Sequence, residues 1–356
     1  MTDISVISNL GLARNLPTTT AHGFAFIDAY PNEPDWKSWQ GAGAMVFDRS
    51  PRAKIELTGP HAAPFLHNLC SNDVKGLAVG DGCELFFADK TARYVGFGNV
   101  YHLILSDGRH AFWLDLPVGS GTRMIQHLDK FLVSEQVEFA ERTAEFCQFH
   151  LAGDGAAKIL SFLIQEPMPE LANHQHMVRT IDERIPCNIR RNDHLGVPGY
   201  DLVMLHSRAQ AVWERAIAAG ANPMGELAYQ GLRIRAGYPD EPAELDGTVR
   251  VMEVDRPQTA ISDKKGCYLG QEPIVMARDR GQLNRKLRKI RLKGDQLAPG
   301  PFTIEGKDAG RLTSLVACEP PGEFLGLAYL RRGYWEENQV RKAESQGQSA
   351  EFSVMP

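Results

Sequence analysis

The chain of 356 residues has no CxxC pair and no long apolar run. Its six cysteines are scattered along the sequence, at positions 70, 83, 147, 187, 267 and 318. Secreted disulfide frameworks are denser and occur in smaller chains, so this scatter predicts a reducing, cytoplasmic setting. A membrane span needs about 20 consecutive apolar residues, and none is present. No basic segment precedes an apolar run near the start, which predicts that there is no secretory signal.

Familiar catalytic motifs are also missing. There is no Walker loop, no Gly-x-Ser-x-Gly elbow and no His-Glu-x-x-His sequence. Gly41-Ala-Gly43 lacks the third glycine of a dinucleotide fingerprint. His174 and His176 have no evident third ligand nearby, so a surface loop is favoured over a metal site.

What is present indicates a globular protein with more than one domain. Apolar residues make up 43% and charged residues 23%, and the length exceeds that of one ordinary core. Strands are predicted within 45–60 and 83–116, and helices at 61–69, 121–132, 151–163, 208–219 and 271–287. Lys54 to Thr58 alternates in the manner of a half-buried sheet. Antiparallel hairpins mixed with helices favour an α+β fold.

The pattern changes near residue 285. Short strands are predicted at 288–292, 302–304, 310–316 and 324–330, broken by Gly, Pro and Asp, which is typical of a small β-barrel or sandwich. We therefore expect a lead-in at 1–20, an α+β region at 21–284 made of two subdomains, and a C-terminal domain at 285–356.

Positive charge is concentrated between Lys264 and Lys293. Ten basic residues and two acidic ones give this segment a charge of +8, which leaves −13 for the rest of a chain whose total is −5. Such asymmetry predicts a positive face that attracts anionic ligands. The alternative is a solvated basic helix and strand.

Cys267 lies inside this segment, between Gly266 and Gly270 and next to Lys264 and Lys265. A thiol beside lysines and near a helix N-terminus has a lowered pKa, and the thiolate attacks electrophiles or binds metal. The alternative is a small buried filler, as many lone cysteines are.

At this point the residues resemble a family. Lys265-Gly-Cys-Tyr-Leu-Gly-Gln-Glu272, followed by Ala277-Arg278 and Arg280-Gly281, is similar to the signature of the YgfZ branch of the glycine-cleavage T-protein superfamily. Further similarity lies at Asn72-Asp73-Val74, at Leu232-Arg233-Ile-Arg-Ala-Gly237 and in the C-terminal strands. The resemblance implies α+β subdomains around a central cavity for tetrahydrofolate, with a terminal β-barrel. It also implies that the basic segment binds the glutamate tail of tetrahydrofolate.

Two departures from the family's pattern bear on chemistry. The superfamily's aminomethyltransferases have an Asp-Asp pair that supplies the catalytic carboxylate. At the corresponding positions this sequence has Val95 and Gly96. Where their pterin-binding glutamate stands, it has Val197, so Glu226, Glu253 or Asp201 would have to substitute.

Three hypotheses follow. The first is a folate-binding protein for iron–sulfur cluster assembly or repair, with iron–sulfur assembly proteins or apo-enzymes as partners, Cys267 as the reactive thiol and Lys265 as its activator. Its candidate folate-binding residues are Asn72, Arg233, Tyr268, Gln271, Glu272, Arg278 and Arg280. The second is a tetrahydrofolate-dependent aminomethyl or methyl transferase. The third is an RNA-binding module, which is disfavoured because no aromatic residue lies between Pro273 and Lys293.

Overall fold

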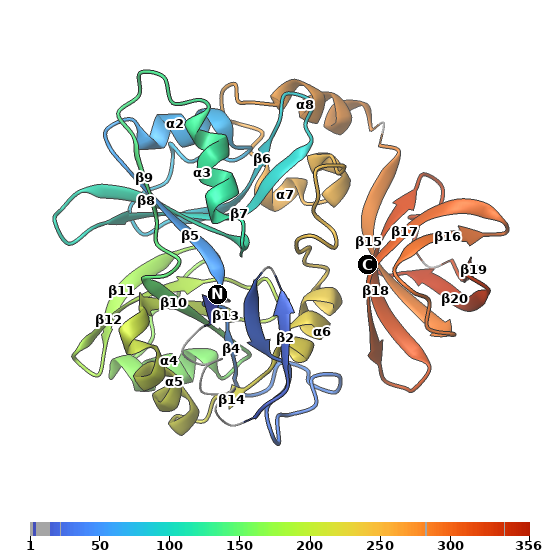
Figure 1. Cartoon of the computed structure of the whole chain (residues 1–356), viewed down its shortest axis with the longest axis horizontal. Coiled ribbons are helices and arrows are strands. Elements are labelled where there is room, and N and C mark those ends of the chain that lie inside the picture. The colour runs from blue at the N-terminus through green and yellow to red at the C-terminus, as the bar shows by residue number, and fades with distance from the viewer. Residues whose placement is uncertain (1–2, 5–14, 22, 282, 338) are drawn as a thin grey trace.

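A computed structural model describes residues 3–4, 15–21, 23–281, 283–337 and 339–356. Its strands form a three-stranded sheet, a five-stranded sheet, a six-stranded sheet and a closed six-stranded barrel. Figure 1 shows the two larger sheets stacked one above the other, with the barrel beside them.

The five-stranded sheet is antiparallel throughout. Its order is β6 (Gly82–Ala88), β7 (Tyr94–Ile104), β8 (His110–Val118), β5 (Arg52–Thr58) and β9 (Glu138–Glu141). Helices α2 (Ala62–Leu69) and α3 (Gly121–Asp129) belong to its outer core. There, Ile55 and Leu57 pack with Phe65, Leu66 and Met124, so every second residue of β5 is held by apolar burial.

The six-stranded sheet has the order β11 (His176–Ile181), β12 (Ile185–Arg191), β13 (Gly199–Leu205), β10 (Phe146–Ala152), β4 (Met45–Asp48) and β14 (Asn222–Pro223). Its outer core includes α4 (Ala156–Ile164) and α5 (Ala209–Ala218). Leu160 and Leu163 of α4 pack there with Phe149 and Leu151 of β10.

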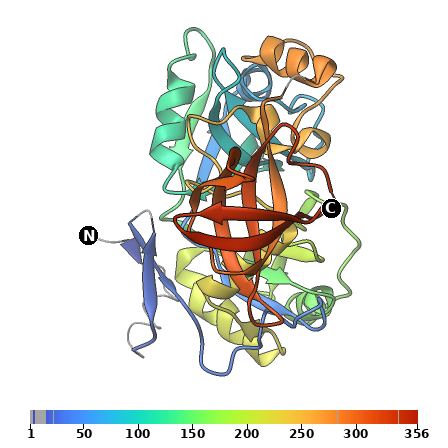
Figure 2. The ribbon, with the colours of Figure 1, turned by 90° about the vertical axis from the view of Figure 1, so that its right-hand side faces the viewer.

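The other elements lie between and around these sheets. They are β1 (Asp3–Ile4), β2 (Thr18–Ala21), β3 (Phe24–Ile27), the 3-10 helices η1 (His206–Arg208) and η2 (Val251–Val254), α6 (Glu226–Ala236), α7 (Pro257–Ala260) and α8 (Gln271–Arg280). Figure 2 shows the N-terminal strands to one side of the barrel.

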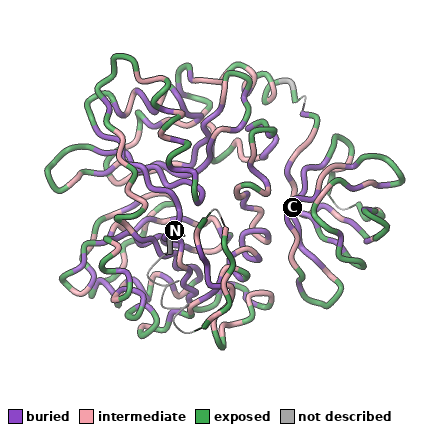
Figure 3. Tube along the Cα trace, in the orientation of Figure 1, coloured by how far each residue is buried: buried purple, intermediate pink, exposed green. Residues whose placement is uncertain are grey.

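The barrel runs β15 (Arg285–Gly294), β18 (Glu323–Arg331), β17 (Lys307–Cys318), β16 (Gly300–Ile304), β19 (Arg341–Ser345) and β20 (Gln348–Val354). It closes because β20 pairs with β15. Ile290, Phe302 and Phe352 fill its interior. Figure 3 shows buried segments along the inner strands and exposed ones at the loop tips.

The predicted α+β fold with a C-terminal barrel is confirmed. Three helix boundaries were wrong. The helix predicted at 121–132 ends at Asp129. The helix predicted at 271–287 ends at Arg280, since Gly281 takes a left-handed conformation (φ 58°) and Arg285 begins β15. The helix predicted at 151–163 begins at Ala156, because Leu151 and Ala152 complete β10. Strands β19 and β20 were not predicted.

Candidate functional site

The inner faces of the two large sheets are polar, yet they are buried. All seven residues of β5 are buried, so its polar side does not face water as the alternation of Lys54 to Thr58 had suggested. Burial of Arg52 and Lys54 requires the second sheet to cover them and to provide partners for their charges.

We call the buried polar residues of these faces the inter-sheet layer. Its members are Arg52, Lys54, Asn99, Tyr101, Asp115, Gln148, His150, Arg190 and Asp201. Arg52 pairs with Asp115 at 2.5 Å, and the Gln148 amide donates to the same carboxylate at 2.9 Å. His150 Nδ1 lies 2.9 Å from Asp201 Oδ1. This layer was not predicted from the sequence. The signal for it was a polar residue at every second position of strands whose other positions are apolar.

The pKa values of two charged groups in the inter-sheet layer, those of Lys54 and Asp201, are shifted far from their usual range. Burial lowers the pKa of Lys54 to about 8, although its amine donates to the carbonyls of Ser50 and Arg52. Burial would raise the pKa of Asp201, but the hydrogen bond and charge of His150 hold it well below its usual range. Several polar atoms of the layer are buried without a hydrogen-bond partner among the described residues. They are Oδ1 and Nδ2 of Asn99, Tyr101 Oη, Gln148 Oε1, His150 Nε2 and both Nη atoms of Arg190.

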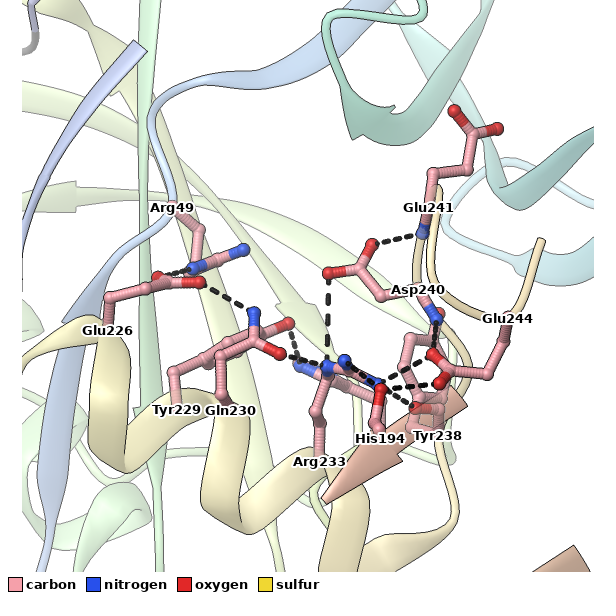
Figure 4. Close-up of polar contacts among 11 residues, drawn as sticks. Arg49, His194, Glu226, Tyr229, Gln230, Arg233, Tyr238, Asp240, Glu241 and Glu244 are labelled. Carbon is pink, nitrogen blue, oxygen red and sulfur yellow. Dashed lines mark hydrogen bonds and ion pairs between the residues drawn. The ribbon is translucent and has the colours of Figure 1, made fainter. Parts of the chain in front are cut away.

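A second group of side chains, which we call the central cluster, adjoins this layer. It consists of Arg49, His194, Tyr229, Tyr238 and Asp240, which come from the end of β4, the loop before β13, α6 and the segment after α6 (Figure 4). The His194 ring lies 4.3 Å from that of His150 and 5.0 Å from that of Tyr238, centroid to centroid. His194 Nε2 is 3.1 Å from Tyr229 Oη. The central cluster therefore combines three aromatic rings with charged groups.

Opposite charges meet in the central cluster. The Arg49 guanidinium stacks 3.6 Å from the centre of the Tyr229 ring and pairs with Glu226 at 2.6 Å. Asp240 Oδ1 accepts the backbone amide of Glu241 at 2.9 Å, and Oδ2 lies 4.0 Å from Arg233 Nε. Burial disfavours the charge on Arg49, but Glu226 and, more weakly, Asp240 raise its pKa overall. Arg49 Nε and His194 Nδ1 are buried with no partner in the described part of the chain.

Arg233, expected to bind an anionic tail, is occupied by the protein itself. It is 3% exposed and pairs with the fully buried Glu244 at 2.9 Å. It also donates to the Tyr238 carbonyl at 3.2 Å and to the Ser314 hydroxyl of the barrel at 3.2 Å. Arg233 thus lies where α6 meets the barrel, and its role in binding a folate tail stays a prediction.

The segment around Cys267 is held by Lys265. The Lys265 ammonium donates to the carbonyls of His67, Cys70 and Asn72, so it binds the C-terminal end of α2. Burial lowers its pKa. This is a structural role that the sequence analysis did not predict, and activation of Cys267 by Lys265 stays a prediction.

Cys267 is accessible. Among the six cysteines it is the exposed one, Cys83 is half-buried and the other four are buried. Its neighbour Tyr268 is buried and lies 4.7 Å from the Lys265 ammonium, ring centre to Nζ. Burial raises the pKa of Tyr268 to about 12. The thiol therefore stands at the surface on an anchored turn.

The other candidate folate-binding residues are spread over this surface. Gln271 is half-buried and Glu272 is exposed at the start of α8. Arg278 is exposed and pairs with Asp279 at 2.8 Å, while the Arg280 side chain lies outside the described residues. Asn72 donates to the carbonyls of Glu84 and Thr259 at 2.7 and 2.9 Å, which joins β6 to α7. Among the described side chains of this group, the hydrogen bonds and ion pairs lead to other residues than those of the central cluster.

The basic segment is partly neutralised by acids from elsewhere in the chain. Arg285 pairs with Glu253, Lys286 with Asp255, Arg288 with Asp255 and Glu337, and Arg291 with Glu323. The expected positive face is thus weaker than the charge count of the segment implied, because folding brings distant carboxylates to it.

The positions of the missing family acids differ in surroundings. A Cβ on Gly96 would lie 2.1 Å from Met124 Cε, so this position faces the outer apolar core. Val95 packs against the same core. On the other side of β7, Phe97 lies 5.7 Å from Tyr238, ring to ring. Val197 packs in an apolar cluster with Trp39 and Leu195. Among the described residues, no group of three or more His, Cys, Asp or Glu side chains could hold a metal ion.

Comparison with known proteins identifies the family. The model of the GCVT N-terminal domain matches residues 40–260. The chain belongs to the GCVT N-terminal domain family. A chloroplastic protein of Arabidopsis thaliana, At1g60990, for which a transferase activity is proposed, is 27% identical over 86% of this chain and 69% of its own length. An aminomethyltransferase of Rubrobacter xylanophilus is 25% identical over 81% of this chain and 76% of its own.

The fold agrees with this assignment. The crystal structure of the glycine cleavage system aminomethyltransferase T from Bartonella henselae superposes with a TM-score of 0.85, covering 100% of this chain and 97% of that one at 17% identity. Within the described ranges, no helix is long and apolar enough to cross a membrane.

Proposed function

We propose that this GCVT-family protein binds a reduced folate at the central cluster and acts through Cys267 in iron–sulfur cluster assembly or repair, in the cytoplasm. The observation that carries the folate part is Asp240, a carboxylate among the rings of the central cluster. The family's aminomethyltransferases use tetrahydrofolate, which makes this cofactor the one to test against these residues.

The residues of the central cluster suit a pterin. A pterin is a flat heterocycle with adjacent N–H donors, and a carboxylate accepts such a pair of donors well. Asp240 has one backbone donor and a long ion pair, so its oxygens retain acceptor capacity. Tyr229, Tyr238 and His194 offer rings for stacking, and the unpartnered atoms of Arg49 and His194 can bind ring acceptors. Asp240 would thereby take the role of the pterin-binding glutamate, at whose position this chain has Val197.

Classical aminomethyl transfer is not favoured. The positions expected to carry the catalytic acids hold Val95 and Gly96, and Gly96 faces an apolar core in which a carboxylate would be costly. Neither residue can stabilise charge that develops on a substrate amine. A fold of the GCVT family without these catalytic acids supports an accessory role.

The accessible thiol supports the iron–sulfur part of the proposal. Cys267 is exposed on a turn that Lys265 and Tyr268 anchor, so a partner protein or its cluster can reach the sulfur. Thiolates are the usual protein ligands of iron–sulfur clusters. The cluster is cargo or substrate here and not a resident cofactor.

Calorimetric titration of the full chain with tetrahydrofolate and its 5-formyl derivative tests the folate part. We expect wild type to bind, and Asp240→Asn to lose about tenfold to a hundredfold in affinity, because charge-assisted hydrogen bonds weaken. Asp107→Asn, in an exposed turn, is the matched control and should bind as wild type does. An absence of binding by wild type overturns this part of the proposal.

A cell lacking the native protein tests the thiol. We expect Cys267→Ala to fail to restore the activity of cluster-dependent enzymes, while Cys83→Ala, a half-buried cysteine, restores it. Restoration by Cys267→Ala to the wild-type level, at equal protein abundance, would contradict the thiol-centred role.

A second candidate is a tetrahydrofolate-dependent one-carbon transferase. It is favoured by the aminomethyltransferases among the relatives and by the presence of an acid, Asp240, near the candidate pterin site. It predicts that some donor yields methyl- or methylene-tetrahydrofolate in the presence of the protein, and that Asp240→Asn stops this turnover. If such turnover is found while Cys267→Ala retains it, the transferase replaces the iron–sulfur role.

A further inference from the structure

A groove of about 410 Å³ lies where the barrel meets the segment that follows α6. Figure 1 shows β15 and β18 on the side of the barrel that faces the α+β region. Five arginines line the groove, and only two acids do so: Arg93, Arg250, Arg285, Arg311 and Arg331, with Glu253 and Asp308. We call these residues the arginine groove. A groove of this volume is in the range of small-molecule sites.

The arginines converge from distant parts of the sequence. The backbones of Arg93 and Arg250 form an isolated antiparallel bridge, so these two side chains share one edge of the groove. Arg285, Arg311 and Arg331 come from β15, β17 and β18 of the barrel. Mutual repulsion makes such convergence unfavourable in the absence of compensating negative charge.

That compensation is incomplete. Arg285 pairs with Glu253 at 2.9 Å, Arg331 with Asp308 at 2.6 Å, and Arg311 with Asp246 at 3.6 Å. The guanidinium groups of Arg93 and Arg250 form no ion pair among the described residues, and both residues are exposed. Their backbone N–H groups donate to the carboxylates of Asp89 and Glu253 at 3.0 Å. With Asp246 included, five positive charges face three negative ones, which leaves +2.

The donors of the groove are also not fully used. Arg93 Nη1 donates to the Gly247 carbonyl at 3.3 Å, a long bond to a neutral acceptor. Arg311 Nη2 donates to the Ala243 carbonyl at 3.2 Å, while its Nε is buried with no partner among the described residues. A guanidinium binds carboxylate or phosphate oxygens with two parallel N–H donors, and this geometry is stronger than a single bond to a carbonyl.

We infer that the arginine groove is a binding site for a small anion that carries at least two neighbouring charged groups, either phosphates or carboxylates. Arg93 and Arg250 would bind one group, and Arg311 would bind another. Two groups fit the groove better than one because the donors without acidic partners lie on different elements. A concave, positively charged surface also raises the local concentration of such anions.

This inference does not rest on folate binding at the central cluster. Thr248 and Arg250 line the groove, whereas Tyr238 and Asp240 of the same connecting segment belong to the central cluster. Either site can therefore be present without the other, and the tests use different ligands and different variants.

Calorimetric titration of the full-length protein tests the groove, with inorganic pyrophosphate as the phosphate probe and γ-linked tetraglutamate as the carboxylate probe. The variant is Arg93→Ala/Arg250→Ala. Its control, Arg109→Ala/Arg179→Ala, removes the same charge from exposed arginines outside the groove. We expect at least one probe to bind wild type, the groove variant to lose about tenfold or more, and the control to lose less than about twofold.

Further arms identify the source and the geometry. Binding of pyrophosphate alone identifies a phosphate ligand, and binding of tetraglutamate alone identifies a carboxylate ligand. Arg93→Lys/Arg250→Lys keeps the charge but loses the paired donors, so we expect an intermediate affinity. The inference is overturned if neither probe binds wild type, or if the control weakens binding as much as the groove variant does. Thermal unfolding of each variant verifies that loss of binding is not loss of fold.

Discussion

Lys54 holds an amine between the two large sheets, at a position with no exposure to solvent. Burial lowers its pKa from 10.5 to about 8, and the charges of Arg190 and Arg52 act in the same direction. The folded state therefore holds this proton less tightly than the unfolded chain does. Between about pH 8 and 10.5 the unfolded state binds more protons at this site, so the contribution of Lys54 to stability rises with pH.

We compare the free energy of unfolding of wild type with that of Lys54→Met. We expect the value for wild type, relative to the variant, to be about 3 kcal/mol higher at pH 10.5 than at pH 7.5, since each pKa unit corresponds to about 1.4 kcal/mol. Urea denaturation at both pH values measures this difference. Lys342→Met, at an exposed position of the barrel, should keep a constant difference from wild type. A constant difference for Lys54→Met as well would mean that Lys54 is not desolvated.

At the same scale, the sequence revealed two-residue alternation but not which side of a strand is buried. Arg52 and Lys54 alternate with Ala53 and Ile55 as they would on a half-exposed sheet. Whether their side meets water depends on the second sheet, whose Gln148 and Asp201 come from strands far along the chain. Periodicity is a local property, whereas this burial is created by tertiary packing.

At the scale of elements, Lys265 connects the Cys267 turn to the end of α2. Its three bonds to carbonyls satisfy acceptors that have few other donors at a helix C-terminus. We expect Lys265→Met to lower the free energy of unfolding by roughly 2–4 kcal/mol, because these buried acceptors lose a charged donor. Chemical denaturation checks this value.

Lys264→Met is the matched control, since Lys264 is the exposed neighbour and a change within about 0.5 kcal/mol is expected there. If Lys265→Met is as stable as this control, the contacts with α2 contribute little. The predicted role of Lys265 in activating Cys267 would then be the better explanation of its position.

The end of α8 illustrates which boundaries a sequence can reveal. Residues 271–287 read as one helical pattern, yet Gly281 permits the left-handed turn at which α8 stops. Arg285 to Gly294 then extends because β18 and β20 supply hydrogen-bonding partners on both sides. The glycine was a local signal for the end of the helix, whereas the strand depends on distant partners, from Glu323 opposite Lys293 to Arg331 opposite Arg285.

For the whole molecule, the resemblance of several segments, among them the one around Cys267, predicted the superfamily to which residues 40–260 match, and the strand pattern after residue 285 predicted the barrel. The resemblance did not predict which residues surround Arg233. The partners of Arg233 are Glu244 in the following segment and Ser314 in the barrel, and their proximity follows from how the barrel packs on α6. A residue shared with a family's pattern can thus serve the assembly of the fold.

Arg233 and Glu244 form a buried ion pair within the α+β region, and both side chains bond to Ser314 of the barrel. Glu244 is fully buried, it accepts from the Arg233 guanidinium at 2.9 Å, and it accepts from the Ser314 hydroxyl. Glu244→Gln keeps the shape but leaves a buried guanidinium without its counter-charge, which costs about 3–5 kcal/mol. We expect this variant to unfold at lower urea concentration, with the barrel separating from the remainder in an earlier transition.

Tryptophan fluorescence monitors this unfolding, because Trp335 packs in the barrel whereas Trp113 and Trp213 lie in the two sheet regions. Glu344→Gln removes the same charge from an exposed pair of the barrel and should change stability by less than about 1 kcal/mol. If Glu244→Gln unfolds in a single transition with control-like stability, the barrel is held to the α+β region by the apolar cluster that contains Tyr238 and Leu327. The ion pair then serves only to neutralise Arg233.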